Sequence, residues 1–396
     1  MNKKIHPRGA QAPLVGSKLK LHIEKLAVGG AGVARHEGFV VFVPLAAPYD
    51  ELLVEITVSK KNFAEGKILE VLKSGPSRRT PPCPVATVCG GCNWQQIQEE
   101  EQCAQKELLV QETLKKFNPD LQFDYLPIRP SPRSLRYRNR IQPKYRAGKF
   151  GFFARNSHDI VNITDCPITE NTLTEEFANV RSWIAEKNPK GTQRLEMYIS
   201  DQNEVRYGLI TDEDDGIGFS QVNRFQSEEL VQTALSWAAL PNDQDFSTIY
   251  DLYAGSGNFT FPFSTKYTKS RIVGVELNAK LVTKARSDIQ DARIEFHVSD
   301  VEKFVLNTKI GPSDLVLLDP PRAGTSQIIM EKLAAARPKK IIYISCHPVS
   351  LARDLKWFFA EANAQGVRYK LARVQAFEMF PQTDHVETIA ELRVDS

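Results

Sequence analysis

The strongest candidate nucleophile in the chain is a cysteine that directly follows a short apolar run. Cys346 stands in the sequence Ser345-Cys346-His347-Pro348, after the apolar run 340–344. A thiolate is a soft nucleophile that can add to an electron-poor double bond. The alternative is a buried structural thiol, which is the usual state of a free cysteine. The nucleophile interpretation is favoured if a cofactor site lies beside this cysteine.

A glycine-rich turn after another apolar run predicts such a cofactor site. The sequence from Asp251 to Phe259 reads Asp-Leu-Tyr-Ala-Gly-Ser-Gly-Asn-Phe, and its glycines allow the backbone to approach a ligand at the carboxyl end of a strand. A dinucleotide fingerprint has a third Gly or Ala where Thr260 stands, so NAD fits poorly, whereas S-adenosylmethionine has no pyrophosphate and does not need that glycine. Glu276 and Asp300 follow the next two predicted strands, where carboxylates can reach the ribose hydroxyls and the adenine edge. The alternative is an ordinary strand-to-helix turn.

Two further motifs carry acidic side chains towards the same predicted sheet edge. Asp319 begins the sequence Asp-Pro-Pro-Arg after the apolar run 315–318, and the two prolines make the chain rigid there. A rigid turn without chemistry is the alternative. Near the C-terminus, His385 and Glu387 have the spacing of side chains on one face of a strand, so either can serve as a general base. A solvated strand edge explains this pair equally well.

Four cysteines predict a metal site. Cys83, Cys89 and Cys92 have the spacing Cys-x5-Cys-x2-Cys, and Cys166 follows later in the chain. In a reducing cytosol, clustered thiols ligate metal more often than they form disulfides. Four thiolates suit a [4Fe–4S] cluster or zinc, but structural zinc usually shows two close pairs, so the single Cys-x2-Cys favours iron–sulfur. Cys103 stands inside a predicted helix and is assigned to packing.

A basic segment predicts contact with nucleic acid. Residues 127–150 contain eight Lys or Arg and no Asp or Glu, although the whole chain has a net charge of only +3. Tyr137 and Tyr145 lie among these basic residues, and aromatic rings can stack on exposed bases while cations neutralise phosphates. Residues 1–82 are also basic, with 13 Lys or Arg against 7 Asp or Glu. The charge distribution favours RNA as a partner of the first half of the chain; a solvated face is the alternative.

The elements that must position these residues fall into three parts. Residues 16–72 contain closely spaced strands with glycine-rich and charged turns, which predict a small barrel or sandwich. The segment 95–117 contains no Gly or Pro and predicts a long helix. Strands return between about 122 and 226, with a short helix at 170–186. From about 226 onward, apolar strands alternate with helices, which is typical of a parallel, doubly wound sheet.

Composition places the chain among ordinary globular proteins. Its 396 residues predict two or three domains, and apolar and charged residues make up 42% and 25% of them. No apolar run reaches about 18 residues, and the N-terminal stretch lacks the apolar segment of a signal peptide. The composition therefore excludes a mainly disordered, fibrous or membrane-spanning protein, and it predicts a cytoplasmic one.

The ordered set of motifs resembles the RNA (uracil-5-)-methyltransferase family over nearly the whole chain. The glycine-rich turn 27–32 is similar to that of the small RNA-binding barrel called TRAM. The four cysteines, together with residues 155–161, resemble the cluster-binding segments of the iron–sulfur members. Residues 219–223, Phe-Ser-Gln-Val-Asn, resemble a motif that precedes the catalytic domain of the family. The family's later motifs follow in the expected order at Asp251, Asp319, Cys346 and Glu387.

The resemblance implies a multidomain α/β fold and roles for named residues. It implies a TRAM/OB-like barrel at 1–74, a central β-rich iron–sulfur and RNA-binding domain at 75–225, and a Rossmann-like class I methyltransferase domain at 226–396. The helix at 95–121 is expected to pack back on the catalytic domain. Cys346 is implied as the nucleophile and Glu387 as the base. The implied ligands of the [4Fe–4S] cluster are Cys83, Cys89, Cys92 and Cys166. The implied contacts of S-adenosylmethionine are Gln221, Tyr253, Asn258, Glu276, Asp300 and Asp319.

The implied reaction is methylation of C5 of a uridine in RNA, with 23S ribosomal RNA expected first and the T loop of transfer RNA second. Uracil C5 is a weak nucleophile, so addition of the Cys346 thiolate to C6 is expected to activate it. A base must then remove the C5 proton. A monomer that does not bind membranes is expected.

Four other classes of protein remain as alternatives. A cytosine-5 RNA methyltransferase normally has a Cys directly after Asp-Pro-Pro, where this chain has Arg322. An exocyclic-amine methyltransferase needs no nucleophilic cysteine, and a non-catalytic RNA-binding or ribosome-assembly protein needs neither Cys346 nor Glu276. An iron–sulfur oxidoreductase is the weakest alternative, because no flavin or dinucleotide fingerprint is present.

Overall fold

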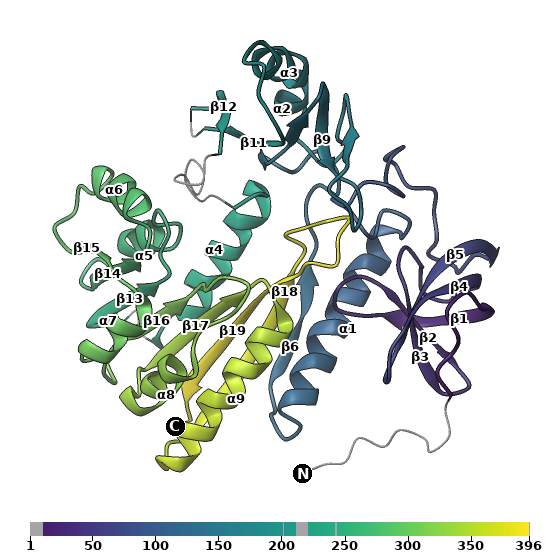
Figure 1. Cartoon of the computed structure of the whole chain (residues 1–396). Helices are drawn as coiled ribbons and strands as arrows, with labels where there is room; N and C mark the ends of the chain where they lie inside the picture. Colours follow the sequence, from purple (N-terminus) through teal and green to yellow (C-terminus); the bar gives the residue numbers. More distant parts are fainter. Residues whose placement is uncertain (1–10, 201, 211–220, 242–243, 396) are drawn as a thin grey trace.

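Three β-sheets and one long helix organise the chain (Figure 1). The computed structural model describes residues 11–200, 202–210, 221–241 and 244–395. Over these ranges, every helix is too short or too polar to cross a membrane.

The N-terminal part is a closed five-stranded barrel with strand order β1-β2-β3-β5-β4. Buried and more exposed positions alternate along β1 and β3, so one side of each strand fills the barrel. The small barrel predicted from the sequence is therefore confirmed. Its strands are β1 (Lys18–Leu26), β2 (Gly32–His36), β3 (Phe39–Val43), β4 (Glu51–Ser59) and β5 (Ala64–Lys73).

The central part is a six-stranded sheet with the path β10-β9-β8-β11-β12, and β7 pairs with β11. Two short helices pack on it, one through Leu173 and the other through Phe177, Val180 and Ile184, and these residues share a core with Leu195. The elements are β7 (Arg140–Ile141), β8 (Lys144–Arg146), β9 (Lys149–Phe153), β10 (Ile160–Asn162), α2 (Asn171–Glu175), α3 (Phe177–Glu186), β11 (Gln193–Ile199) and β12 (Val205–Leu209).

The third part is an eight-stranded sheet with helices on both faces and strand order β15-β14-β13-β16-β17-β19-β18-β6. It is called the catalytic part below because the family resemblance implies the catalytic domain there. Its strands are β6 (Asp124–Arg129), β13 (Thr248–Leu252), β14 (Arg271–Glu276), β15 (Ile294–Val298), β16 (Leu315–Leu318), β17 (Lys340–Ser345), β18 (Tyr369–Phe377) and β19 (Glu387–Val394). Helices α7 (Val301–Asn307), α8 (Gln327–Ala336) and α9 (Pro348–Ala364) supply the core on one face. Helices α4 (Arg224–Ala238), α5 (Thr260–Lys266) and α6 (Ala279–Ser287) supply the core on the other.

This sheet differs from the predicted parallel sheet in its last strand, β19, which is inserted between β17 and β18. β19 pairs antiparallel with both β17 and β18. The connection 378–386 contains no helix and is shorter than the roughly dozen residues that a crossover between parallel strands needs. The two strands must therefore run in opposite directions.

Helix α1 (Glu99–Phe117) lies between the barrel and the catalytic sheet (Figure 1). Its buried residues Val110 and Leu114 join the core of the catalytic part, and Leu109 packs with Leu26 of the barrel. The adjacent strand β6 then pairs with β18 in parallel and becomes the edge of the catalytic sheet. The segment 99–129, which the expected boundaries place within 75–225, therefore packs on the eight-stranded sheet.

Candidate active site

The turn after β13 has an unusual backbone. Gly257 has a φ of +98°, and a Cβ atom there would lie 2.4 Å from the ring of Phe261. Tyr253 also has a positive φ, of 68°. Behind the turn, the buried Asp251 carboxylate accepts a hydrogen bond of 2.6 Å from the hydroxyl of Thr260, at the start of α5. The glycine is therefore needed for space and conformation, and the turn is fixed to the helix that follows it.

Glu276, the last residue of β14, connects the turn after β13 to the loop after β14. Its carboxylate accepts hydrogen bonds from the backbone N–H of Gly255 at 3.1 Å and of Asn278 at 2.8 Å. Asp300 instead caps α7, because its carboxylate accepts the N–H of Lys303 at 3.0 Å. Both carboxylates lie where the sequence placed them, at the carboxyl ends of β14 and β15.

A cavity of about 670 Å³ opens at this edge, which is large enough for a nucleoside-sized ligand. Of the six expected donor contacts, four line this cavity: Gln221, Tyr253, Asn258 and Asp319. Glu276 reaches it through its hydrogen bond to Gly255, which is a lining residue. Asp300 lies outside its lining within the described part of the chain. Phe219 and Ser220, in the motif before Gln221, are outside the described residues.

Several lining residues were missed by the sequence reasoning. Asn139 and Asn203 come from the central part, and Arg224 and Ser227 from α4. The Ser227 hydroxyl donates to the Asn258 side chain at 3.5 Å. The amide oxygen of Asn139 is buried and has no hydrogen-bond partner among the described residues. The available sequence signals were weak: Asn139 lies inside the basic segment, and Arg224 directly follows the motif that contains Gln221.

Asp319, Cys346 and Glu387 meet at the ends of three neighbouring strands. β16 precedes Asp319 and pairs with β17, which precedes Cys346. β19 begins at Glu387 and pairs with β17, so that Ser345 lies opposite Thr388. The register therefore places the three side chains in one group, although 68 residues separate the first from the last in sequence (387 − 319).

The environment of this group favours uncharged forms. Burial raises the pKa of the Cys346 thiol to about 12, and the neighbouring Glu387 and Asp319 add to this shift. Burial and then the Asp319 charge raise the pKa of Glu387 well above its usual range. Burial and the Asp251 charge raise the pKa of Asp319 to about 7. The Asp319 and Glu387 carboxylates repel each other when both are ionised. A cation bound beside them would lower these pKa values and so favour the ionised forms, the thiolate and the carboxylates.

The Glu387 carboxylate is buried and not fully hydrogen-bonded among the described residues. It is 3% exposed, and its Oε1 atom has no hydrogen-bond partner within the described ranges. The other candidate, His385, lies in the loop before β19, so the expected common strand face is not formed. Burial lowers the pKa of His385. The chain bends at Gln382, which has a φ of 70°, and a turn follows. The strand β19 therefore begins only at Glu387.

The four cysteines line one hollow of about 60 Å³ in the central part. Cys166 lies near enough to interact electrostatically with Cys83, Cys89 and Cys92. The backbone N–H of Gly91 points to Cys89 Sγ at 3.4 Å, a contact that favours a thiolate. Thiolates around one zinc ion would lie about 3.8 Å apart, from a Zn–S length of about 2.3 Å. Within the described residues, no three His, Cys, Asp or Glu side chains converge in a single-ion geometry.

Part of the basic segment is buried or paired with acidic residues of the protein itself. Tyr137 and Tyr145 are buried, so the expectation that they stack on exposed bases is wrong. Both rings are needed for packing: Tyr145 in the core of the central sheet and Tyr137 beside Cys92. Arg136 forms an ion pair with Asp165. Local composition could not show these pairings, because the acidic partners lie elsewhere in the chain.

The fold and the site together define a methyltransferase that depends on S-adenosylmethionine. A mixed sheet covered on both faces carries a Gly-x-Gly turn, an acidic residue after the next strand and a nucleoside-sized cavity at its carboxyl edge.

Comparison with known proteins identifies the family of methyltransferases to which the chain belongs. Residues 13–69 match the TRAM domain, and residues 306–393 match the family described as tRNA (Uracil-5-)-methyltransferase. The chain is 67% identical over 396 residues to an uncharacterized RNA methyltransferase of Bdellovibrio bacteriovorus, and the alignment covers both chains completely. It is 29% identical over 434 residues to the 23S rRNA (uracil(1939)-C(5))-methyltransferase RlmD of Aliivibrio fischeri, covering 94% of this chain and 95% of the relative. The chain belongs to the RNA (uracil-5-)-methyltransferase family, whose members are S-adenosylmethionine-dependent enzymes.

A solved structure has the same fold over most of the chain. It is the tRNA (uracil-54, C5)-methyltransferase of Pyrococcus abyssi in complex with S-adenosyl-L-homocysteine. The TM-score is 0.72 at 23% sequence identity, with 94% of this chain and 100% of that chain covered. The predicted methyltransferase fold is thereby confirmed.

Proposed function

We propose that this enzyme methylates C5 of a specific uridine in RNA through a covalent bond between Cys346 and uracil C6. The observation that carries the proposal is the grouping of a thiol, a buried unpartnered carboxylate and Asp319, which also lines the cavity. Each group corresponds to one requirement of the reaction: a nucleophile, a base and a negative charge near the donor.

The donor site is proposed at the cavity beside β13. Gln221, Tyr253, Asn258 and Asp319 line that cavity, and Glu276 and Asp300 stand at the ends of the next two strands. The sulfonium of S-adenosylmethionine is a cation, so its binding there would lower the raised pKa values of Asp319, Glu387 and Cys346. Donor binding would thus prepare the nucleophile.

The proposed reaction balances in three steps. The Cys346 thiolate forms a bond to C6, and the C5–C6 π electrons move into an enolate over C5 and O4. C5 then attacks the donor methyl group, and the sulfonium becomes the neutral thioether S-adenosylhomocysteine. Finally the Glu387 carboxylate removes the C5 proton, the C5=C6 bond forms again, and the C6–S bond breaks to release the thiolate.

The RNA substrate is proposed to be 23S ribosomal RNA, because a full-length relative at 29% identity is named for that substrate. The T loop of transfer RNA is the second candidate, because the matching family is described by transfer RNA. In either RNA, the target base must leave its stack to reach a thiol at the sheet edge.

We also propose that Cys83, Cys89, Cys92 and Cys166 hold a [4Fe–4S] cluster. The four thiols line one hollow, and the single Cys-x2-Cys pair in the sequence favours this cluster over structural zinc, which usually has two close pairs. Methyl transfer needs no electrons from such a cluster, so its proposed role is to hold residues 83–92 and 166 together.

The test is a methyl-transfer assay on protein purified without oxygen. Labelled S-adenosylmethionine is supplied with unmodified ribosomal RNA or transfer RNA, and the labelled nucleoside is identified. Label in 5-methyluridine, abolished by Cys346→Ala, is expected from the ribosomal RNA. Label in cytidine or adenosine, or full activity of Cys346→Ala, would overturn the proposed chemistry.

A further inference from the structure

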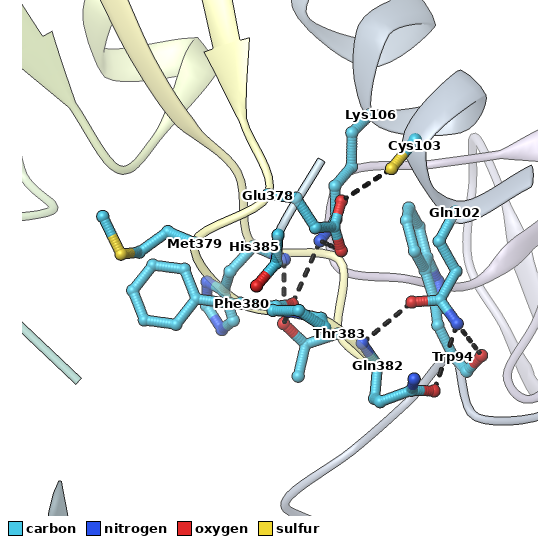
Figure 2. A network of polar contacts seen from close by, with 12 residues as sticks. Trp94, Gln102, Cys103, Lys106, Glu378, Met379, Phe380, Gln382, Thr383 and His385 are labelled. Carbon is cyan, nitrogen blue, oxygen red and sulfur yellow. Dashed lines mark hydrogen bonds and ion pairs between the residues drawn. The ribbon is translucent and has the colours of Figure 1, made fainter. Parts of the chain in front are cut away.

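The loop 378–386 joins β18 to β19 and ends directly before Glu387. Figure 2 shows that this loop lies within a dense polar network. Contacts reach it from the central part through Tyr137, whose hydroxyl donates to the Pro381 carbonyl at 3.0 Å. Asn223, at the start of α4, donates to the Met379 carbonyl at 3.3 Å. The loop is therefore fixed by segments that are distant in sequence.

Gln382 shows that the loop conformation depends on these outside contacts. Its φ of 70° is unfavourable for a residue with a Cβ atom, by on the order of 1 kcal/mol. The side chain is fully buried, and its amide oxygen accepts hydrogen bonds from Arg79 at 2.9 Å and Gln102 at 3.1 Å. Its backbone N–H donates to Gln102 (Figure 2). Its carbonyl accepts the N–H of Trp94. Helix α1 and the segment after Cys92 thus impose the bend.

Asn93 and Asp384 connect the cysteine segment to the same loop by a reciprocal pair. The Asn93 amide nitrogen donates to Asp384 Oδ1 at 2.7 Å, and the Asp384 backbone N–H donates to Asn93 Oδ1 at 3.0 Å. The other carboxylate oxygen, Oδ2, accepts the N–H of Gly29 in the barrel at 2.8 Å. Gly30 packs so closely that a Cβ atom there would lie 2.1 Å from the Asn93 amide. Three parts of the protein meet at this pair.

Asn93 directly follows Cys92, and Asp384 lies three residues before Glu387. We propose that Asn93 and Asp384 are positioning residues that fix the loop and hold the Glu387 carboxylate at the C5 proton. This inference rests on the proposed function, in which Glu387 is the base. It assigns the cysteine segment a role in the chemistry: the segment is an anchor for the base as well as a part of the RNA-binding region.

The reaction order provides a specific readout for this role. If Glu387 is misplaced, thiol addition and methyl transfer still proceed, but loss of the C5 proton and release of the thiolate are slow. The enzyme would then accumulate as a methylated RNA–protein adduct that resists denaturation in detergent. A variant that is merely unfolded would lose the adduct and the product together.

The experiment compares Asn93→Ala with the exchange variant Asn93→Asp/Asp384→Asn. In the exchange variant, the carboxylate introduced at position 93 can accept both the backbone N–H and the new side-chain amide at position 384. The oxygen of that new amide can still accept the N–H of Gly29. Asn93→Ala is expected to lower kcat by about tenfold to a hundredfold, the size of effect that a misplacement of about 1 Å produces. The fraction of labelled, detergent-stable adduct should rise at least threefold, and the exchange variant should restore both values to within about threefold of wild type.

Two variants serve as references. Arg271→Ala removes an exposed ion pair with Glu295, 2.7 Å away, at the start of β14, and should behave as wild type because it leaves the loop and the site at the other end of the strand untouched. Glu387→Gln should accumulate the adduct without product. Iron content and visible absorbance are measured for every variant, and those of Asn93→Ala should equal wild type.

The outcomes separate the two proposals. If Glu387→Gln accumulates adduct while Asn93→Ala turns over normally, the positioning role is wrong and the proposed function stands. If Glu387→Gln turns over without adduct, the assignment of the base fails, and with it the premise of the inference. Loss of activity in Asn93→Ala without adduct, with no recovery in the exchange variant, would also refute the positioning role.

Discussion

The buried ion pair between Lys106 and Glu378 allows a stability prediction of definite size. Lys106 Nζ lies 2.8 Å from Glu378 Oε1, and the two side chains are 0% and 6% exposed (Figure 2). The same ammonium donates to the Phe380 carbonyl at 3.0 Å. The perturbation is Lys106→Met, which keeps the length and most of the volume of the side chain but removes the charge.

The expected cost follows from what the substitution leaves behind. Removing one partner of a buried ion pair typically destabilises a protein by about 3–5 kcal/mol, because the other charge stays buried and uncompensated. The Cys103 thiol still donates to Glu378 Oε2 at 3.3 Å, and this remaining hydrogen bond limits the cost. We therefore expect the lower end of the range, about 3 kcal/mol.

Amide hydrogen exchange in α1 and in the loop 378–386 measures this cost locally. At about 1.4 kcal/mol for each factor of ten, 3 kcal/mol corresponds to exchange that is faster by about a hundredfold or more. Strands β2 and β3 belong to a different core, that of the barrel, so their amides serve as the internal control.

The double variant Lys106→Met/Glu378→Leu tests the reasoning itself. Replacement of a buried ion pair by apolar side chains of similar volume is often neutral or stabilising, so its exchange rates should return towards wild type. If the double variant exchanges as fast as the single one, or if the single variant exchanges as slowly as wild type, the argument from the uncompensated charge is wrong.

Two further predictions concern the charges of the active site. Asp319 has its pKa raised from 3.8 to about 7 by burial, so its neutral form stabilises the folded state below about pH 4, and this contribution disappears as the pH rises through 7. Asp319→Asn should therefore raise the Tm of the ligand-free protein by an amount that grows between about pH 4 and 7 and is constant above; a difference that shrinks over that range would contradict this. Because burial raises the pKa of Cys346 to about 12, its alkylation by iodoacetamide should be slow at pH 8. Sinefungin, which carries a cationic amine in place of the sulfonium, should speed that alkylation relative to S-adenosylhomocysteine, whose thioether is neutral. Mass spectrometry of the Cys346 peptide measures the rate. Equal rates with both analogues would show that charge does not control this thiol.

Much of the catalytic fold could be predicted from the sequence because its signals are local. Short apolar runs followed by Gly, Asp or Cys mark strands β13, β16 and β17 and place their last residues at one edge. The same periodicity, with glycine turns, marks the barrel strands. These signals are contained in fewer than ten residues each, so an isolated sequence is sufficient to read them.

The rest of the site depends on pairings between distant segments. The six residues of β6 contain no signal that their partner is β18, more than 200 residues later. Tyr137 was predicted to face RNA, but it is buried and its hydroxyl bonds to Pro381. Asn93 and Asp384 are ordinary polar residues in the sequence, and their separation of 291 residues conceals the pair. Local composition contains no information about such partners.

The position of Glu387 shows why so many distant contacts are concentrated on one loop. On its C-terminal side, the register of β19 against β17 fixes the backbone, since Thr388 lies opposite Ser345. Register alone leaves the first residue of a strand free to fray, because its N-terminal neighbour belongs to a loop. The contacts of Gln382 and Asp384 supply the missing restraint from that side. The carboxylate that we propose as the base is therefore held by the sheet on one side and by α1, the barrel and the cysteine segment on the other.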